Sequence, residues 1–491
     1  MKYLLGIDFG GGASKATLLG EDGRIYATST TEYNTYYPCV GYAEQNPADW
    51  VLATCKNISE VIEKSKISAS DILAVSLDAA THTAVIMDDA FNVIRPAIYW
   101  TDTRSTKEVQ FLKEHYGDII KKQVLHKPDT IWSLPELLWI KNNEPYNWSK
   151  VKKILFAKDY VRHFLTGDYV TDHIEAEGSM MFDVNTMCWS EELLSVLDIK
   201  SEMMPKLIKP TDIAGKVTDK AAEATGLLKG TPVLCGTTDT VMEVFAAGAV
   251  KKGQMTLKLA TAGRICVVTD KPYPDINLIN YSHITEGMFY PGTATKSCAS
   301  SYRWFRDTFG GEYKELDSLA SEIPIGADGL VFHPYLNGEL TPYANPELCA
   351  DFVGFRASHT KAHFTRAVLE GVVMSMLDCK KTLDNLNIEH ENKAVIIGGG
   401  GKSLLWRQMV SDALEIELIE MKYADSSFGS AMLAGVAVGV FDDFSDALEK
   451  CNDVVSRTLP NPENTQKYQS LFKKYKAVQK ALEPVYNGDF I

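Results

Sequence analysis

The stretch "GIDFGGGASKATLLGEDGRIYATSTT", residues 6–31, decides the fold expected for the start of this chain. An apolar run ends in Asp8, three glycines follow, and the next residues alternate and are rich in Thr and β-branched side chains. A dinucleotide-binding loop would need a third glycine where Lys15 stands, followed by a helix. The pattern instead predicts a β-meander with a glycine hairpin after Asp8 and a tight turn at residues 20–23.

The second half of the chain repeats this pattern. Residues 231–250, "TPVLCGTTDTVMEVFAAGAV", predict a buried strand, a turn and a helix, and residues 253–270, "GQMTLKLATAGRICVVTD", again give a strand, a short Gly-containing turn and a strand. Two such hairpins indicate a duplicated α/β fold that holds a nucleotide, with a boundary near residue 245. The alternative for each hairpin is a plain β-turn in which glycine supplies a positive φ.

A third glycine run lies near the C-terminus, in "AVIIGGGGKSLLWRQMVSDAL" at residues 394–414. It is not a P-loop, because Ile396 stands where that motif needs its first glycine. The sequence predicts a buried strand, a glycine-lined turn, and a helix capped by Ser403. Such a turn suits an adenine or its ribose; the alternative is close packing of the strand against the helix.

Composition limits the kind of protein this is. The 491 residues carry a formal net charge of -14, which predicts two domains and gives a nucleic-acid surface little support. No apolar run reaches bilayer length, so no membrane span is expected. Nine cysteines without CxxC spacing fit a reducing cytosol, hence a cytoplasmic location. Ten histidines show no ligand spacing.

Several collinear motifs resemble the FGGY family of carbohydrate kinases, and within it the xylulokinase-like branch. They are "GYAEQNPADW" (41–50), "HTAVIMDDAFNVIRPAIYWTDTRS" (82–105), "AKDYVRHFLTGDYVTD" (157–172), "GTTDT" (236–240), "PYLNGELTPYANP" (334–346), "RAVLEGV" (366–372) and "GGGGKSLLWRQMVSDAL" (398–414). The resemblance implies an α/β fold of two actin-like, ribonuclease H-like ATPase domains, residues 1–245 and 246–491. It also implies an interdomain cleft with sugar deep inside, and ATP with magnesium at the mouth.

The resemblance assigns chemistry to two acidic residues. Asp239 matches the family's catalytic aspartate, which accepts the proton of the attacking hydroxyl, and phosphoryl transfer requires a carboxylate so placed. Asp8 matches the aspartate near the metal and phosphates. Magnesium takes one or two carboxylates, so Asp8 and Asp239 would suffice to bind it. Without the resemblance, Asp239 could simply cap the helix that follows.

The sugar and nucleotide residues also follow from the resemblance. Those matching the sugar pocket are Thr81, His82, Trp100, Asp102 and Arg104, together with Asp239. Those matching the nucleotide loops are Gly10, Gly11, Gly12, Thr261, Gly263, Gly399, Gly400 and Gly401. Two alternatives stay open from the residues themselves: a lone histidine is more often a satisfied core residue, and an Asp and an Arg two residues apart suit an ordinary salt-bridged strand end.

The chain departs from the family pattern at four places. Gly11 lies where a Thr or Ser hydroxyl is common, Ala80 replaces a Gln, Glu136 replaces a Lys, and Ala260 replaces a Gly. Changed partners for sugar hydroxyls can shift substrate preference about tenfold or more. D-xylulose is therefore the first expectation, followed by other pentuloses, hexuloses and sugar alcohols. The alternative is a sugar-binding regulatory protein with weak or no transfer. The expected partners are a small sugar and ATP, and the sequence leaves a homodimer open.

Overall fold

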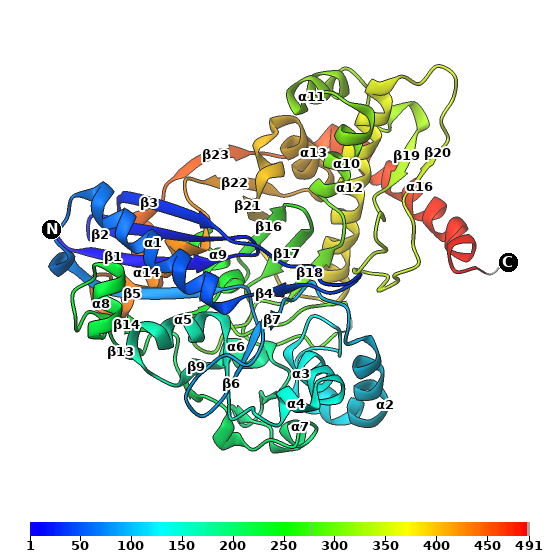
Figure 1. The fold of residues 1–491 in the computed structure, drawn as a ribbon. Coiled ribbons are helices and arrows are strands. Elements are labelled where there is room, and N and C mark those ends of the chain that lie inside the picture. Colours follow the sequence, from blue (N-terminus) through cyan, green and yellow to red (C-terminus); the bar gives the residue numbers. More distant parts are fainter. Residues whose placement is uncertain (276, 489–491) are drawn as a thin grey trace. The chain divides into compact units, whose positions relative to one another are not determined.

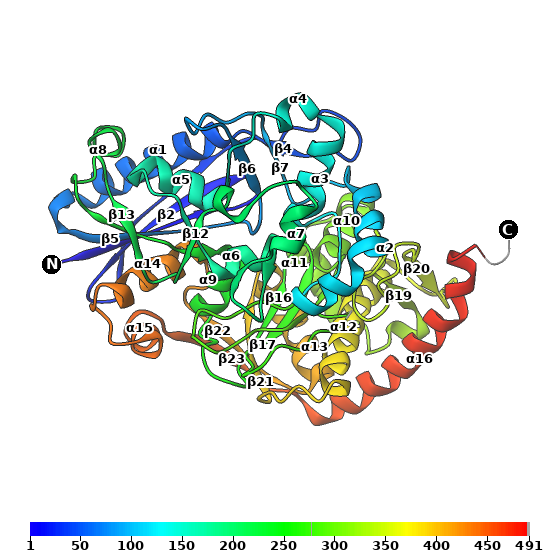
Figure 2. The same ribbon diagram turned by 90° about the horizontal axis from the view of Figure 1, so that it is seen from below.

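The computed structural model describes residues 1–275 and 277–488, which form two compact units (Figures 1 and 2). The first contains residues 1–250, 281–286 and 423–452, and the second contains 251–280, 287–422 and 453–491, within the described residues. These units differ from the predicted domains, 1–245 and 246–491, mainly because residues 423–452 pack with the first unit. Among the described residues, no helix is both long and apolar enough to cross a membrane.

The first unit is built on one mixed sheet. Its strands run in the order β13-β14-β5-β1-β2-β3, and β15 pairs with β5 beside β14. Strands β1, β2 and β3 form the predicted antiparallel meander, whereas β5 and β14 run parallel to β1. The sheet strands are β1 (Tyr3–Phe9), β2 (Ala13–Gly20), β3 (Ile25–Glu32), β5 (Ile72–Ala79), β13 (Ile213–Lys216), β14 (Pro232–Leu234) and β15 (Thr237–Thr238).

Helices and short strands complete the first unit. α1 packs on β2 and β3, and α14 packs on β1 and β5. The helices are α1 (Pro47–Ser65), α2 (Thr106–Gln123), α3 (Ser133–Asn143), α4 (Pro145–Trp148), α5 (Ala157–Thr166), α6 (His173–Gly178), α7 (Glu191–Ser195), α8 (Asp219–Thr225), α9 (Asp239–Ala246), α14 (Ser426–Ala437) and α15 (Phe444–Cys451). The short strands are β4 (Glu44–Gln45), β6 (Ala84–Met87), β7 (Ala97–Ile98), β8 (Lys153–Phe156), β9 (Val170–Asp172), β10 (Phe182–Asp183), β11 (Cys188–Trp189) and β12 (Lys206–Ile208).

The second unit repeats the topology of the first. Its sheet has the order β18-β17-β16-β21-β22-β23. β16, β17 and β18 are antiparallel, β21 and β22 run parallel to β16, and the last strand is antiparallel, as β13 is in the first unit. The predicted duplication is therefore visible in the strand order itself.

The elements of the second unit frame one apolar core. The strands are β16 (Met255–Leu259), β17 (Gly263–Val267), β18 (Gly292–Thr295), β19 (Val331–His333), β20 (Asp351–Val353), β21 (Lys393–Ile397), β22 (Glu417–Met421) and β23 (Val454–Thr458). The helices are α10 (Ala299–Phe309), α11 (Tyr313–Ser321), α12 (Lys361–Asn385), α13 (Leu404–Leu414) and α16 (Pro462–Tyr486). An apolar stripe of α12 lies in this core, since Val368, Val372 and Met376 are buried. Burying each such side chain contributes about 1.5–3 kcal/mol.

Candidate active site

Carboxylates from several elements gather at one end of the first unit's sheet. Asp8 lies near the end of β1, and its register partner on the parallel strand β5 is Asp78. Asp78 in turn pairs with Thr237 of β15, which leads directly into Asp239. Asp425 caps the N-terminus of α14, which packs on the same two strands. The parallel direction of β1, β5 and β15 brings their ends to one edge, so residues far apart in sequence meet there.

Burial and mutual repulsion define the electrostatics of this cluster. Burial, followed by the charge of Asp239, raises the pKa of Asp8 to about 7, although hydrogen bonds with Asp78 and Ser426 oppose the rise. Burial and the neighbouring Asp8 also raise the pKa of Asp78 well above its usual range. Ser430 Oγ donates to Asp78 Oδ2, and the buried Oδ1 of Asp8 has no hydrogen-bond partner among the described residues. The cluster therefore favours a proton or a cation.

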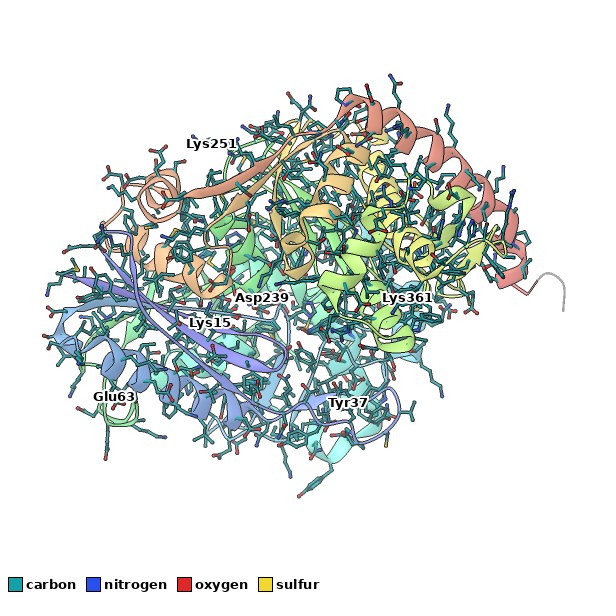
Figure 3. All side chains as sticks on the ribbon, turned by 90° about the horizontal axis from the view of Figure 1, so that it is seen from above. Lys15, Tyr37, Glu63, Asp239, Lys251 and Lys361 are labelled. Atoms are coloured by element: carbon teal, nitrogen blue, oxygen red, sulfur yellow. The ribbon has the colours of Figure 1, made fainter. Side chains whose placement is uncertain are left out.

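Asp239, labelled in Figure 3, is the first residue of α9. Its Oδ1 accepts hydrogen bonds from the Thr240 amide at 2.6 Å and from the Thr240 hydroxyl at 3.2 Å. The N-cap position of α9 belongs to Thr238, whose side chain makes no capping hydrogen bond. The helix thus begins at Asp239, which is not its N-cap residue.

The first glycine hairpin connects β1 to β2 next to Asp8. The carbonyls of Gly10 and Gly11 accept hydrogen bonds from side chains, Tyr33 for the former and Gln45 for the latter. Gly11 and Gly12 are exposed, and none of the three glycines has a positive φ. A Cβ atom on Gly11 would lie 2.5 Å from the Tyr99 hydroxyl oxygen, whereas a Cβ on Gly12 would meet nothing within 4 Å. The positive-φ explanation of this run therefore does not apply.

His82 follows β5 and is buried, with 5% of its surface exposed. It adopts a left-handed φ of 57°, its amide donates to Glu175, and its ring packs 4.8 Å from that of Trp132. Burial, with a smaller contribution from His126, lowers the pKa of His82 to about 3. The ring is therefore neutral. Its Nδ1 is buried without a hydrogen-bond partner among the described residues, so His82 is not a core histidine with both nitrogens satisfied. Thr81, beside it, is also buried.

Asp102 and Arg104 form a buried ion pair. Arg104 Nη2 lies 2.8 Å from Asp102 Oδ2, its Nη1 lies 2.7 Å from Glu44, and its guanidinium stacks 3.8 Å from the Tyr42 ring centroid. Asp102 Oδ2 also accepts from the Ala43 amide at 2.6 Å. Both charged groups thus have ion-pair and hydrogen-bond partners within the protein, which fits the alternative of a salt-bridged strand end.

Two residues near this ion pair have contrasting surroundings. Glu136 is buried, and burial and Asp102 raise its pKa well above its usual range, which favours the neutral form of the acidic replacement at this position. Trp100 is 43% exposed, which leaves its indole accessible for an apolar contact.

In the second unit, a pocket of about 560 Å³ lies beside the other two glycine loops. Ser403 caps α13 as predicted, accepting from the Trp406 amide at 3.1 Å, and it donates to Asp317 Oδ2 at 2.7 Å. The Tyr302 hydroxyl donates to Asp317 Oδ1 at 2.7 Å. The lining residues are Ala260, Thr261, Ala299, Tyr302, Arg303, Tyr313, Lys314, Asp317, Gly399, Gly400, Lys402, Ser403 and Trp406. Aromatic walls with a few polar groups suit a planar heterocycle.

Different structural constraints act on the glycines of these two loops. A Cβ atom on Gly263 would lie 2.5 Å from the Met376 sulfur, and one on Gly400 would lie 2.9 Å from both Leu259 and Trp406. Gly398 has a φ of 90°. Close packing therefore accounts for Gly263 and also for Gly400, where it was the alternative given in the sequence analysis, while Gly399 faces open space; Gly399 and Gly400 both line the pocket. Gly401 is buried and does not line it.

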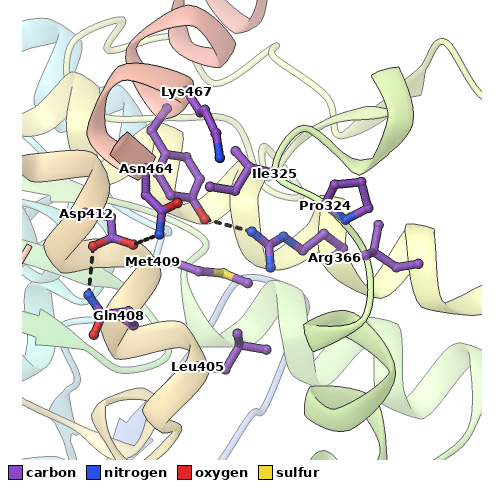
Figure 4. A pocket seen from close by; sticks show the side chains of 11 residues that line it. Pro324, Ile325, Arg366, Leu405, Gln408, Met409, Asp412, Asn464 and Lys467 are labelled. Carbon is purple, nitrogen blue, oxygen red and sulfur yellow. Dashed lines mark hydrogen bonds between the residues drawn. The ribbon is translucent and has the colours of Figure 1, made fainter. Parts of the chain in front are cut away.

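A further pocket of about 500 Å³ lies between α13 and α16 in the same unit (Figure 4). Its polar side chains bond one another: Arg366 donates to the Tyr468 hydroxyl at 2.9 Å, and Asp412 accepts from Asn464 at 2.8 Å and Gln408 at 2.7 Å (Figure 4). Glu370 balances the charge of Arg366. With these polar groups satisfied, this pocket is a weaker candidate than the one beside the glycine loops.

Comparison with known proteins identifies the family. The N-terminal domain model of the FGGY family of carbohydrate kinases matches residues 3–246, and its C-terminal domain model matches residues 235–438. A xylulose kinase of Bacillus subtilis strain 168 is 31% identical over 487 residues, covering 97% of each chain. The chain belongs to the FGGY family of carbohydrate kinases. It is accordingly an enzyme, a phosphotransferase that acts on a small sugar with ATP.

Relatives named for two different substrates have similar sequence identity to this chain. A gluconokinase of Bacillus licheniformis is 29% identical over 500 residues, covering 99% of this chain and 97% of its own. The crystal structure of a ligand-bound xylulose kinase from Lactobacillus acidophilus superimposes with a TM-score of 0.93 at 26% identity, covering all of both chains. The predicted actin-like fold is confirmed by this similarity.

The sequence analysis missed Asp78 and Asp425 in the acidic cluster. Asp78 carries the same signal as Asp8, since it stands near the end of the apolar run "ILAVSLDAA", residues 72–80. A second acidic strand end could therefore have been noted. Asp425 gives a weaker signal, because its role as the cap of α14 is common to many helices.

Proposed function

We propose that this FGGY kinase phosphorylates a hydroxyl of a neutral ketose such as D-xylulose, with Asp239 as the general base. The observation that carries the proposal is the position of Asp239 at the start of α9, close enough to Asp8 for its charge to raise the pKa of that carboxyl. A fixed carboxylate can accept the proton of the attacking hydroxyl as the new bond to phosphorus forms.

The same carboxylates fit a magnesium ion. Asp8 offers a buried Oδ1 without a partner among the described residues, and carboxylate oxygens are the donors that Mg²⁺ prefers. When bound, the ion would neutralise charge on the transferred phosphoryl group. Asp8 and Asp239 would hold it, and the exposed backbone at Gly11 and Gly12 would allow close approach of a phosphate.

For the nucleotide base, we propose the pocket of about 560 Å³ in the second unit. Tyr302, Tyr313 and Trp406 supply apolar walls, and Gly399 keeps one side open. Thr261 is exposed on the hairpin between β16 and β17 that borders this pocket, where its hydroxyl and amide can reach a phosphate. Gly10, Gly263 and Gly401 would shape the loops and need not contact the ligand.

Sugar binding is assigned to the segment around His82, with Thr81 and Trp100 as further contacts. A gluconokinase-like acid substrate is the second candidate, but the charges near His82 disfavour it. Glu175 contacts the His82 amide, Lys158 is bound to two aspartates, and Arg104 is bound to Asp102 and Glu44. Lys158 and Arg104, two cations of this unit, are thus already neutralised, and a neutral sugar avoids an unpaired carboxylate.

An ADP-release assay with magnesium ATP tests the proposal against both alternatives. The panel should contain D-xylulose, other pentuloses, hexuloses, sugar alcohols and gluconate. We expect ADP with a ketose and little with gluconate. A non-transferring sugar-binding protein would instead show a sugar-dependent thermal shift without ADP. Strongest turnover with gluconate would replace the neutral-sugar assignment.

We place the reaction in the cytoplasm, which the nine free cysteines favour.

A further inference from the structure

Asp172, the last residue of β9, is fully buried and contacts four residues: Lys158, Ile174, Glu175 and Thr237. Its Oδ2 lies 2.9 Å from the ammonium of Lys158, which is also fully buried. Its Oδ1 accepts from the amides of Ile174 at 3.0 Å and Glu175 at 3.2 Å, and from the Thr237 hydroxyl at 2.9 Å. One carboxylate thus holds the start of α6 and the strand β15 together.

Each of these two contacts leads to a residue of the proposed site. Thr237 lies two positions before Asp239, and β15 passes directly into α9. Glu175 lies on α6, and its Oε1 accepts from the amide of His82, the residue with a left-handed φ. The turn that carries the proposed base and the segment that carries the proposed sugar contact therefore share one anchor.

The anchor belongs to a buried network of charges. Lys158 lies 2.5 Å from Asp159, which also bonds Arg162 at 2.7 Å, and Arg162 donates to the carbonyl of Cys235 at 2.7 Å. Burial alone lowers the pKa of Lys158, but Asp159 and Asp172 outweigh burial and raise it, so the lysine stays charged. A buried charged network costs desolvation and is retained where it fixes geometry. Cys235 connects it to the turn that precedes Thr237.

We propose that Asp172, neutralised by Lys158, is a positioning residue that fixes the Asp239 turn through the Thr237 hydroxyl and the His82 segment through α6. The inference rests on the proposed function in taking Asp239 as the base. The proposed role concerns the geometry of the protein before any reaction. Hydrogen exchange can therefore test it even if the protein shows no turnover.

A matched set of variants at Thr237 isolates the contact. Thr237→Val keeps the shape of a buried β-strand residue and deletes the hydroxyl, while Asp172 retains Lys158 and two amides as partners. Thr237→Ser restores the hydroxyl. The control is Thr171→Val, which deletes a buried hydroxyl that has no hydrogen-bond partner among the described residues. We expect Thr237→Val to lower kcat about tenfold, the effect of one lost hydrogen bond, with little change in the sugar KM.

Hydrogen exchange gives the second readout. Thr237→Val should exchange faster than wild type in peptides covering residues 237–244, whereas Thr237→Ser and Thr171→Val should match wild type in both measurements. The inference is overturned if Thr237→Val matches wild type in kcat and exchange, or if Thr237→Ser is as impaired as Thr237→Val. If wild-type protein released no ADP with any sugar, the proposed function would fail, and the exchange comparison would still decide the positioning role.

Discussion

Asp8 and Asp78 are direct register partners on the parallel strands β1 and β5, and burial raises the pKa of both carboxyls. A pair of carboxyls at this position is costly for the fold, because both are desolvated and only a proton or a cation can relieve their repulsion. The two carboxyls therefore destabilise the fold and form a site that attracts positive charge.

The first prediction is that Asp8→Asn stabilises the metal-free protein at alkaline pH. The folded pKa of Asp8, about 7, is raised above the ordinary value of 3.8, so its contribution to stability is present at low pH and is lost as pH rises through 7. Asparagine does not ionise. In EDTA, the melting temperature of the variant should exceed that of wild type at pH 8, and the difference should shrink at pH 5. Kinase activity should fall.

The exposed Asp219→Asn variant is the control, since Asp219 pairs with Lys229 at the surface. Its melting temperature should follow that of wild type at both pH values. An Asp8→Asn protein that melts below wild type at pH 8 would contradict the prediction.

The second prediction is that Asp239→Asn abolishes efficient transfer and leaves sugar binding largely intact. The amide keeps the size of the side chain but cannot accept the hydroxyl proton, so kcat should fall by about 10² to 10⁴. Calorimetry of sugar binding and a coupled ADP assay separate the two quantities. Near-normal turnover would remove Asp239 from the mechanism, and lost sugar binding would make it a pocket residue.

The third prediction concerns His82 as a sugar contact. Its ring is neutral and buried, and its Nδ1, which has no hydrogen-bond partner among the described residues, is available to a hydroxyl. His82→Ala should raise the sugar KM or change the preference among ketoses, because the contact exists in both the ground state and the transition state. Steady-state kinetics on the ketose panel measure this. A kcat reduced by several orders at unchanged KM would show that the assignment is wrong.

The fourth prediction concerns the stability effect of the same side chain. The folded pKa of His82, about 3, lies below its ordinary value of 6.5, so protonation favours the unfolded chain and stability falls as the pH drops below 6.5. This histidine alone should cost about 2 kcal/mol at pH 5 relative to pH 7. Melting temperatures at both pH values should therefore differ less in His82→Gln than in wild type.

A control at the exposed His115 of α2 completes that comparison. His115→Gln should retain the wild-type difference between pH 5 and pH 7. If the melting temperature of His82→Gln fell as much between pH 7 and pH 5 as that of wild type, the burial of a neutral His82 ring would be contradicted.

The fifth prediction tests the first glycine hairpin. Gly12 has open space around its would-be Cβ and no positive φ, so Gly12→Ala should fold normally. A methyl group there would obstruct the approach of a phosphate, so the KM for ATP should rise several-fold while the melting temperature stays unchanged. Gly117→Ala on α2, also in open space, is the control: it should leave the KM for ATP unchanged, while alanine inside a helix raises the melting temperature slightly. Unaltered ATP kinetics in Gly12→Ala would argue against phosphate binding at this hairpin.

Local sequence predicted the elements whose cause is local. The meander of residues 6–31 and the cap at Ser403 both depend on periodicity and turn chemistry within a few residues, and each is found in the structure. The repeat of the hairpin pattern likewise predicted two sheets of the same topology, because strand order follows from the order of similar segments. The family resemblance then supplied the kinase assignment.

Tertiary structure decided which charged residues are available for chemistry. Asp102 and Arg104, predicted as polar contacts of the sugar pocket, pair with each other in the interior, while Asp8 keeps a buried oxygen without a hydrogen-bond partner among the described residues. Asp78 and Asp425 joined the cluster only through parallel strand register and the packing of α14. The desolvation of Asp8 and its proximity to Asp239 and Asp425 depend on residues hundreds of positions away, and no local pattern encodes them.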